Sequence, residues 1–118
     1  MAIVADIVVG LIGLLHVWFM LLEMWLWDKP IGLRTCRQTP EAAAATRVLA
    51  ANQGLYNGFL AAGLFWGLSL GAAGNGVKIF FLLCVLVAGV FGAASANRKI
   101  LFLQALPAAI GLGLVVFS

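Results

Sequence analysis

Apolar residues follow one another along this chain in four long stretches, which short polar or glycine-rich connections separate. The stretches lie at about residues 3–27, 40–72, 77–95 and 98–117. An α-helix needs about 20 mostly apolar residues to cross a bilayer, and its backbone polar groups must bond within the helix. The pattern therefore predicts an all-α membrane protein, a bundle of four transmembrane helices that forms one domain over residues 1–118.

The second stretch is predicted to begin outside the hydrocarbon. Thr39 is a candidate N-cap, Pro40 suits the first helical position, and Glu41 suits the positive end of the helix dipole. At about 1.5 Å per residue, a helix over residues 40–72 is roughly 45–50 Å long, which exceeds a bilayer core of about 30 Å. We therefore expect its first turns to project into the cytoplasm.

Four hydrogen-bonding side chains lie where the apolar part of this second helix begins: Asn52, Gln53, Tyr56 and Asn57. At about 100° per residue they fall within one sector roughly 140° wide. We expect this sector to line a polar pocket and to bind a ligand. The alternative is that these groups only fasten the helix to a neighbour, each bond contributing about 0.6 kcal/mol. Gln104, in the fourth stretch, suits either purpose.

The first stretch carries two ionisable residues, His16 and Glu23, on one predicted helix face. They are seven residues apart, or about 10 Å along the axis. Because an ionised group at membrane depth costs roughly 2.5–3.5 kcal/mol, we consider both as catalytic candidates for proton transfer. The alternative is a hydrogen bond from Glu23 or His16 to Asn52, Gln53 or Tyr56 that serves only packing. Trp27 marks the membrane interface and is a candidate ligand contact.

Composition agrees with a membrane protein. Of the 118 residues, 64% are hydrophobic and 9% are charged, and the mean hydropathy is +1.13, far outside the range of soluble domains. The formal net charge of +3 rests on seven basic residues in the connections and near their ends. Basic residues in such connections indicate how the helices are oriented in the membrane. We therefore expect the lipid bilayer as a partner and do not expect nucleic acid.

The basic residues are concentrated in two of the three connections. Lys78 lies alone between the second and third helices, whereas Arg98 and Lys99 lie between the third and fourth. The region between the first two helices has four: Lys29, Arg34, Arg37 and Arg47. The positive-inside rule places connections 28–39 and 96–99 in the cytoplasm and both termini outside. We expect the membrane to be a bacterial inner membrane. Arg98 and Lys99 are also weak catalytic candidates.

Metal and disulfide chemistry are not expected. His16 is the only histidine, and no carboxylate lies three or four residues from it. Cys36 and Cys84 form no motif. Asp6, near the outer end of the first helix, is expected to be solvated.

Local signals predict where helices break or pack. We expect Pro30 and Gly32 to break the helix in the first connection, and Pro107 to kink the fourth helix. Small residues at four-residue spacing in the third helix favour close packing on a neighbour. They are Ala88, Gly92 and Ala96.

The order of these residues resembles a known family. His16, Glu23 and Trp25, followed by ANQGLYNGFLAAGL at residues 51–64, resemble the domain of unknown function 1304 family over nearly the whole chain. More distantly, Arg47 with that segment and NRKILFL at residues 97–103 resemble the membrane-associated eicosanoid and glutathione metabolism superfamily, which includes 5-lipoxygenase-activating protein and leukotriene C4 synthase. This second resemblance implies four helices, outside termini and a homotrimer with sites between subunits.

The superfamily resemblance also names glutathione as a candidate cofactor. Its glutathione-using members carry arginine, asparagine and glutamate on the second helix, at positions that Ala50, Gly54 and Asn57 occupy here. The expected ligand residues are therefore missing, and the cofactor is unknown. Arg98 or Lys99 matches the arginine that those enzymes use near the start of the fourth helix.

The leading hypothesis is binding of a lipophilic small molecule in a partly polar intramembrane cavity. His16 and Glu23 would then carry acid/base chemistry, and the polar residues of the second helix would orient the ligand. Whether the protein is an enzyme stays open. The alternatives are a small proton-coupled transporter that uses Glu23, or a non-catalytic scaffold that presents a lipid.

Overall fold

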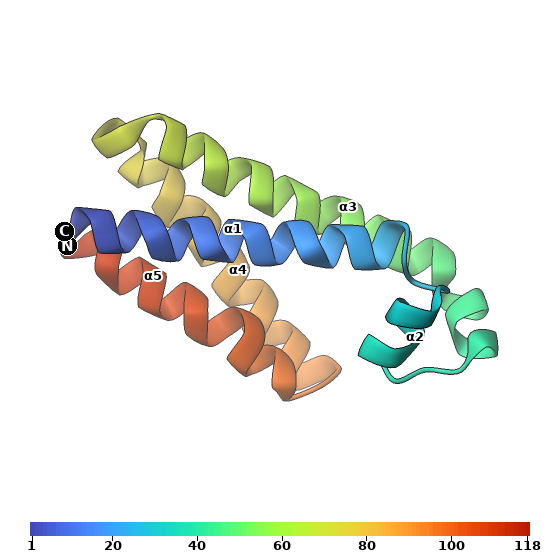
Figure 1. The fold of residues 1–118 in the computed structure, drawn as a ribbon. Helices are drawn as coiled ribbons and strands as arrows, with labels where there is room; N and C mark the ends of the chain where they lie inside the picture. Colours follow the sequence, from blue (N-terminus) through green and yellow to red (C-terminus); the bar gives the residue numbers. More distant parts are fainter. The chain divides into compact units, whose positions relative to one another are not determined.

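The computed structural model describes residues 1–118. The chain consists of helices and the connections between them and contains no strand (Figure 1). The prediction of an all-α chain is therefore confirmed. The α-helices are α1 (Ala2–Met24), α2 (Pro30–Thr35), α3 (Pro40–Ser69), α4 (Asn75–Ser95) and α5 (Leu106–Val116). A 3-10 turn, η1 (Gly71–Gly74), precedes α4, and a π-helical turn, η2 (Leu101–Ala105), precedes α5.

Helix α3 begins where the sequence places its cap. The hydroxyl of Thr39 accepts a hydrogen bond from the backbone N–H of Ala42 at 3.1 Å, and Glu41 lies in the first turn. This bond satisfies one of the N–H groups that a helix leaves unpaired at its start. Pro40 at the first helical position needs no partner, because it has no N–H.

The first connection contains a short helix that the sequence interpretation did not include. Pro30 does not simply break the helix; it begins α2, because a proline is favoured at a first helical position. Gly32 is buried, and a Cβ there would lie 1.9 Å from the carbonyl oxygen of Leu26. Only glycine fits so close to the preceding chain. Arg37 then adopts a left-handed conformation, with φ of 50°, beyond the end of α2.

Pro107 disturbs the helix about one turn before its own position. It cannot donate a hydrogen bond to residue 103, and its ring crowds that carbonyl. The chain widens into the π-helical turn η2 at Leu101–Ala105, and regular α-helix resumes at Leu106. The predicted disturbance of the fourth apolar stretch therefore takes the form of a π-helical turn.

The chain divides into two compact units, to each of which α1 and α3 contribute. The first unit consists of Met1–Gly13 and Ala62–Ser118, and the second of Leu14–Ala61. In the first unit α4 packs along η2 and α5. A Cβ at Gly89 would lie 2.5 Å from the backbone nitrogen of Ala105, so this glycine lets the two backbones approach closely. The buried apolar side chains of this unit include Val9, Leu64, Leu82, Val85 and Ala108.

An ion pair joins two distant parts of the first unit. The ammonium of Lys78 is buried and donates to the Asp6 carboxylate at 3.0 Å, to the Gly71 carbonyl at 3.3 Å and to the Asn75 side-chain oxygen at 3.3 Å. These three acceptors use all the donors of one ammonium group. Asp6, which was expected to be solvated, is exposed, and its half-exposed carboxylate also pairs with Lys78.

Two helical segments are long and apolar enough to cross a membrane, Ala2–Met24 and Gly71–Ser95. The apolar helix Leu101–Val116 is shorter. Helix α3 is long, but polar residues interrupt its apolar part, and it is not among these candidates. The structure thus supports two of the four expected spans by length and composition.

Candidate functional site

The second unit is built on an antiparallel contact between the end of α1 and the middle of α3. A Cβ at Gly54 would lie 2.7 Å from Met24 Cγ, and one at Gly58 would lie 2.7 Å from Met20 Sδ. The two glycines are four residues apart, as are the two methionines. Glycines at this spacing let helices approach closely, and thioethers fill irregular gaps. This spacing is the sequence signal that could have identified the contact.

The polar centre of this contact is a hydrogen bond between Glu23 and Asn57. The side-chain amide of Asn57 donates to Oε1 of the Glu23 carboxylate. Asn57 is buried and Glu23 is half-buried. The second carboxylate oxygen, Oε2, makes no hydrogen bond in the structure. Two of the predicted site residues are therefore brought together.

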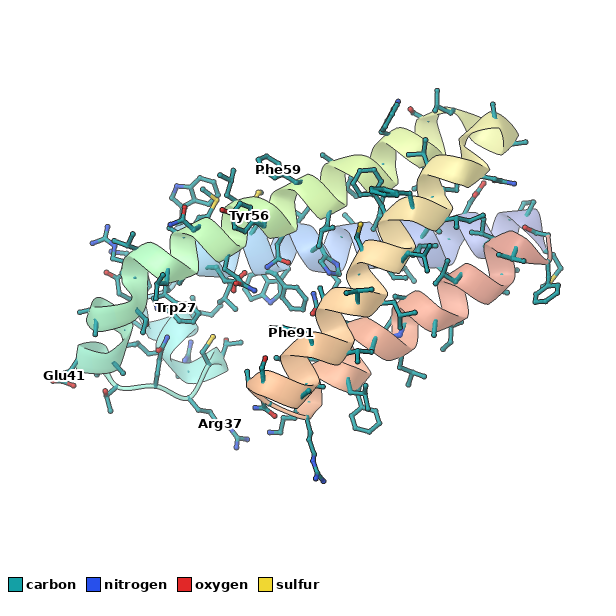
Figure 2. The ribbon with its side chains drawn as sticks, turned by 180° about the vertical axis from the view of Figure 1, so that it is seen from behind. Trp27, Arg37, Glu41, Tyr56, Phe59 and Phe91 are labelled. Atoms are coloured by element: carbon teal, nitrogen blue, oxygen red, sulfur yellow. The ribbon has the colours of Figure 1, made fainter.

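The other three polar residues of α3 do not join this pair. Asn52, Gln53 and Tyr56 are exposed, and the Asn52 amide donates to the carbonyl of Val48 in its own helix at 3.1 Å. The Tyr56 ring lies 6.2 Å from that of Phe59 along α3 (Figure 2). Of the four residues of the predicted sector, only Asn57 therefore bonds a residue of α1. The contacting stripe is narrower than the predicted sector, and its buried members are Ala50, Gly54, Asn57 and Ala61.

His16 is fully buried, with its ring edge-on to Phe19 at a centroid distance of 5.3 Å. It lies seven residues before Glu23 on α1, about 10 Å along the axis, so the two do not form a directly bonded pair. Trp27, labelled in Figure 2, donates its indole N–H to the hydroxyl of Thr46 at 3.1 Å. Its polar atom is thus used in a contact with α3. Near it, Arg47 and Asp28 form an ion pair at 3.8 Å.

The remaining predicted site residues belong to the first unit. Arg98 and Lys99 are exposed in the connection after α4. Gln104 is half-buried in η2. These three residues therefore belong to a different compact unit from Glu23 and Asn57.

Sequence reasoning assigned no role to Cys36 and did not consider Gln38. Burial, and secondarily the negative charge of Glu23, raises the pKa of the Cys36 thiol. The side-chain nitrogen of Gln38 is buried without a hydrogen-bond partner, which is unusual for a polar atom in a folded protein. No spacing rule identifies either residue, because their surroundings depend on α2, which was not expected.

The chemistry available in the second unit centres on one carboxyl group. Asn57 holds one oxygen of Glu23 in a fixed position, and the other oxygen can accept a hydrogen bond or exchange a proton. The structure contains no group of three or more metal-ligating side chains. Gly54 packs on Met24 and Asn57 bonds Glu23, so both residues have structural roles in this contact.

Comparison with known proteins places the chain in a family. Neither the curated proteins nor the solved structures gave a match. A family model described as "Protein of unknown function (DUF1304)" matches residues 10–116. The match covers Glu23, Asn57 and the two glycines of the α1–α3 contact. It extends over most of the sequence, and the chain therefore belongs to the domain of unknown function 1304 family.

Proposed function

We propose that this protein is embedded in a membrane and binds a lipophilic small molecule through Glu23. The observation that carries the proposal is the unused oxygen of a carboxyl group within a helix long enough to span a bilayer. A carboxyl group is costly at the centre of such a helix, by roughly 2.5–3.5 kcal/mol on insertion scales, and the cost for Glu23 is smaller because it lies one residue before the end of α1. The hydrogen bond from Asn57 satisfies only one of the two oxygens of the Glu23 carboxylate.

The surroundings of Glu23 indicate the class of ligand. Its free oxygen suits a hydroxyl, amine or amide donor, and the adjacent Met20 and Met24 offer flexible apolar contacts. An amphiphile with one polar group and an apolar body meets both requirements. Proton exchange with Glu23 would extend binding to acid/base chemistry such as an isomerisation, and glutathione is not part of the proposal.

The membrane arrangement in this proposal has four spans. Helices α1 and α4 have the required length and hydropathy; the apolar second half of α3 and the η2–α5 segment would complete the bundle. The basic connections would face the cytoplasm, with both termini outside. A homo-oligomer, a trimer by analogy with the distant superfamily, belongs to the same proposal.

Proton-coupled transport is the second candidate, because a carboxyl group in a membrane-spanning helix is also how small transporters bind protons. The two candidates differ in what they require. A transporter moves its substrate across vesicles in response to a pH gradient and stops on Glu23→Gln. A binding protein or enzyme holds or converts its ligand in detergent with no gradient.

The test is native mass spectrometry of the protein released from its own membrane in a mild detergent, with accurate mass on bound compounds. We expect one lipophilic compound per chain, and an affinity loss of about tenfold or more in Glu23→Leu, which removes a hydrogen bond to a charged group. Asn52→Leu is the matched control, because Asn52 is exposed on the same helix. Equal retention by both variants would contradict the proposal.

A further inference from the structure

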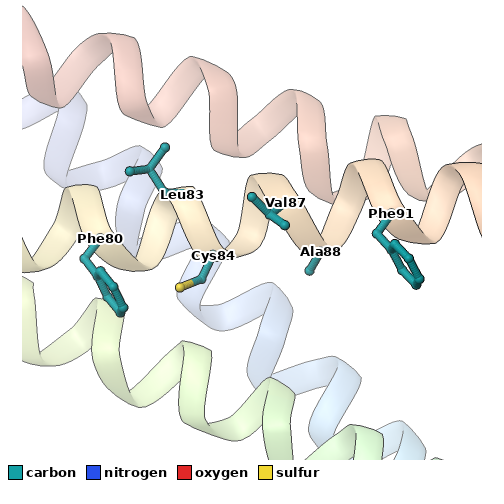
Figure 3. A pocket seen from close by; sticks show the side chains of 6 residues that line it. All are labelled: Phe80, Leu83, Cys84, Val87, Ala88 and Phe91. Carbon is teal, nitrogen blue, oxygen red and sulfur yellow. The ribbon is translucent and has the colours of Figure 1, made fainter.

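An apolar groove runs along one face of α4 in the first unit. Its volume is about 580 Å³, within the range of roughly 300–1,000 Å³ that small-molecule sites occupy. Figure 3 shows Phe80, Cys84, Ala88 and Phe91 in a row along this side of the helix. The small side chains Cys84 and Ala88 form the floor, and the two rings stand at the ends. Leu83 and Val87 complete the lining.

The groove has the dimensions of a single hydrocarbon chain. From Phe80 to Phe91 it extends over eleven helical positions, or roughly 16 Å at about 1.5 Å per residue. One leaflet of a bilayer has a hydrocarbon thickness of about 15 Å, half of the core. Phe80 and Phe91 are 60% and 72% exposed, so no part of the chain covers the ends of the groove.

Two cations lie beyond one end of this groove. Helix α4 ends at Ser95, one turn after Phe91, and Arg98 and Lys99 follow in the next connection. Both are exposed and neither forms a salt bridge. The backbone N–H of Lys99 bonds the Asn97 side chain at 2.9 Å, which fixes the turn that carries them. Two cations without a salt bridge therefore follow the end of the helix that carries the groove.

We propose that this face of α4 binds an anionic phospholipid, with an acyl chain in the groove and the phosphate at Arg98 and Lys99. The inference rests on the membrane embedding proposed above, but not on a ligand at Glu23. Basic residues at the cytoplasmic end of a membrane helix attract anionic headgroups. The groove adds a fixed place for the acyl chain of the lipid. A pair of cations without a groove would bind the headgroup only.

Charge argues against a second copy of the chain as the occupant. Two copies inserted in the same orientation and paired through this face would bring both pairs of cations close together at the end of the shared interface. Like charges placed together are unfavourable. An anionic lipid instead neutralises them.

The test compares two lipids with identical acyl chains on purified protein in a mild detergent. Palmitoyl-oleoyl phosphatidylglycerol and phosphatidylcholine are added in equal amounts, and native mass spectrometry counts the bound lipids. We expect a preference of about tenfold for phosphatidylglycerol, which falls to parity when Arg98→Gln and Lys99→Gln are combined. Arg34→Gln with Arg37→Gln is the control, because it removes two exposed charges elsewhere.

Groove-filling variants test the site of the acyl chain. Ala88→Phe should reduce retention of both lipids several-fold, whereas Val90→Phe, at an exposed α4 position outside the groove, should not. Circular dichroism of every variant verifies that its helix content is unchanged. The proposal is overturned if the preference survives loss of Arg98 and Lys99, if both phenylalanine variants behave alike, or if Ala88→Phe dissociates a dimer.

Discussion

Asn57 differs from its polar neighbours on α3 in having a partner on another helix. Replacing it by leucine leaves the Glu23 carboxylate without its hydrogen bond, so we expect Asn57→Leu to lower the free energy of unfolding by about 1–3 kcal/mol. Asn52→Leu should change it by less than about 0.5 kcal/mol, because Asn52 bonds only its own helix. Unfolding in a detergent titration measures both. Equal effects would show that the Glu23–Asn57 bond is not stabilising.

Cys36 should titrate abnormally for a cysteine. Burial and the charge of Glu23 raise its pKa, so less thiolate is present at a given pH than in a free cysteine, and alkylation should be slower. In a Cys84→Ala background, the pH midpoint of alkylation should lie above that of a cysteine in an unstructured peptide with blocked ends. Glu23→Gln should lower the midpoint without restoring the ordinary value, because burial is the larger cause. An unchanged midpoint in Glu23→Gln would exclude the electrostatic contribution.

Among the elements, the α1–α3 contact depends on glycines in a way that can be measured. A Cβ at Gly54 would lie 3.0 Å from Glu23 Cβ and 3.1 Å from the Met20 carbonyl oxygen. We therefore expect Gly54→Ala to destabilise the protein by about 1–3 kcal/mol through overpacking. Gly113→Ala in α5 is the control, since nothing lies within 4 Å of its Cβ position; it should be neutral or slightly stabilising. Thermal unfolding followed by tryptophan fluorescence compares them.

The helices themselves could be predicted from the sequence, because apolar runs and helix caps are local signals. The start of α3 at Thr39 and Pro40 is an example. The helical period could place Asn57 and Tyr56 in one polar sector, but it could not tell which of them faces α1. That distinction depends on Met20 and Met24 meeting Gly54 and Gly58, a contact between residues 30 or more positions apart.

At the scale of the whole molecule, the Asp6–Lys78 pair is the long-range contact that sequence reasoning missed. The two residues are 72 positions apart, and no periodicity links them. Lys78 was counted as a basic residue of a connection, whereas its side chain is 3% exposed. A buried ammonium requires acceptors, but the sequence alone does not say which carboxylate supplies one.

Substitutions in the Asp6–Lys78 pair should lower the free energy of unfolding, and the effects of the two substitutions should not be additive. Asp6→Asn leaves the buried cation with neutral acceptors only, and we expect a loss of about 1–3 kcal/mol, less than for a fully buried pair because Asp6 is half-exposed. The double variant Asp6→Asn with Lys78→Met should lose less free energy of unfolding than the sum of the losses in the two single variants. Free energies of unfolding for the four proteins of this double-mutant cycle provide the measurement. Strict additivity would mean that the two groups do not interact.

The same ion pair sets an order of events during synthesis. A ribosome adding about 5–20 residues per second needs roughly 4–14 s to make the 72 residues that separate Asp6 from Lys78. Throughout that interval the carboxylate at the start of α1 has no ammonium partner. The nascent first helix must therefore keep Asp6 in contact with water until α4 has been made, and the ion pair closes only then.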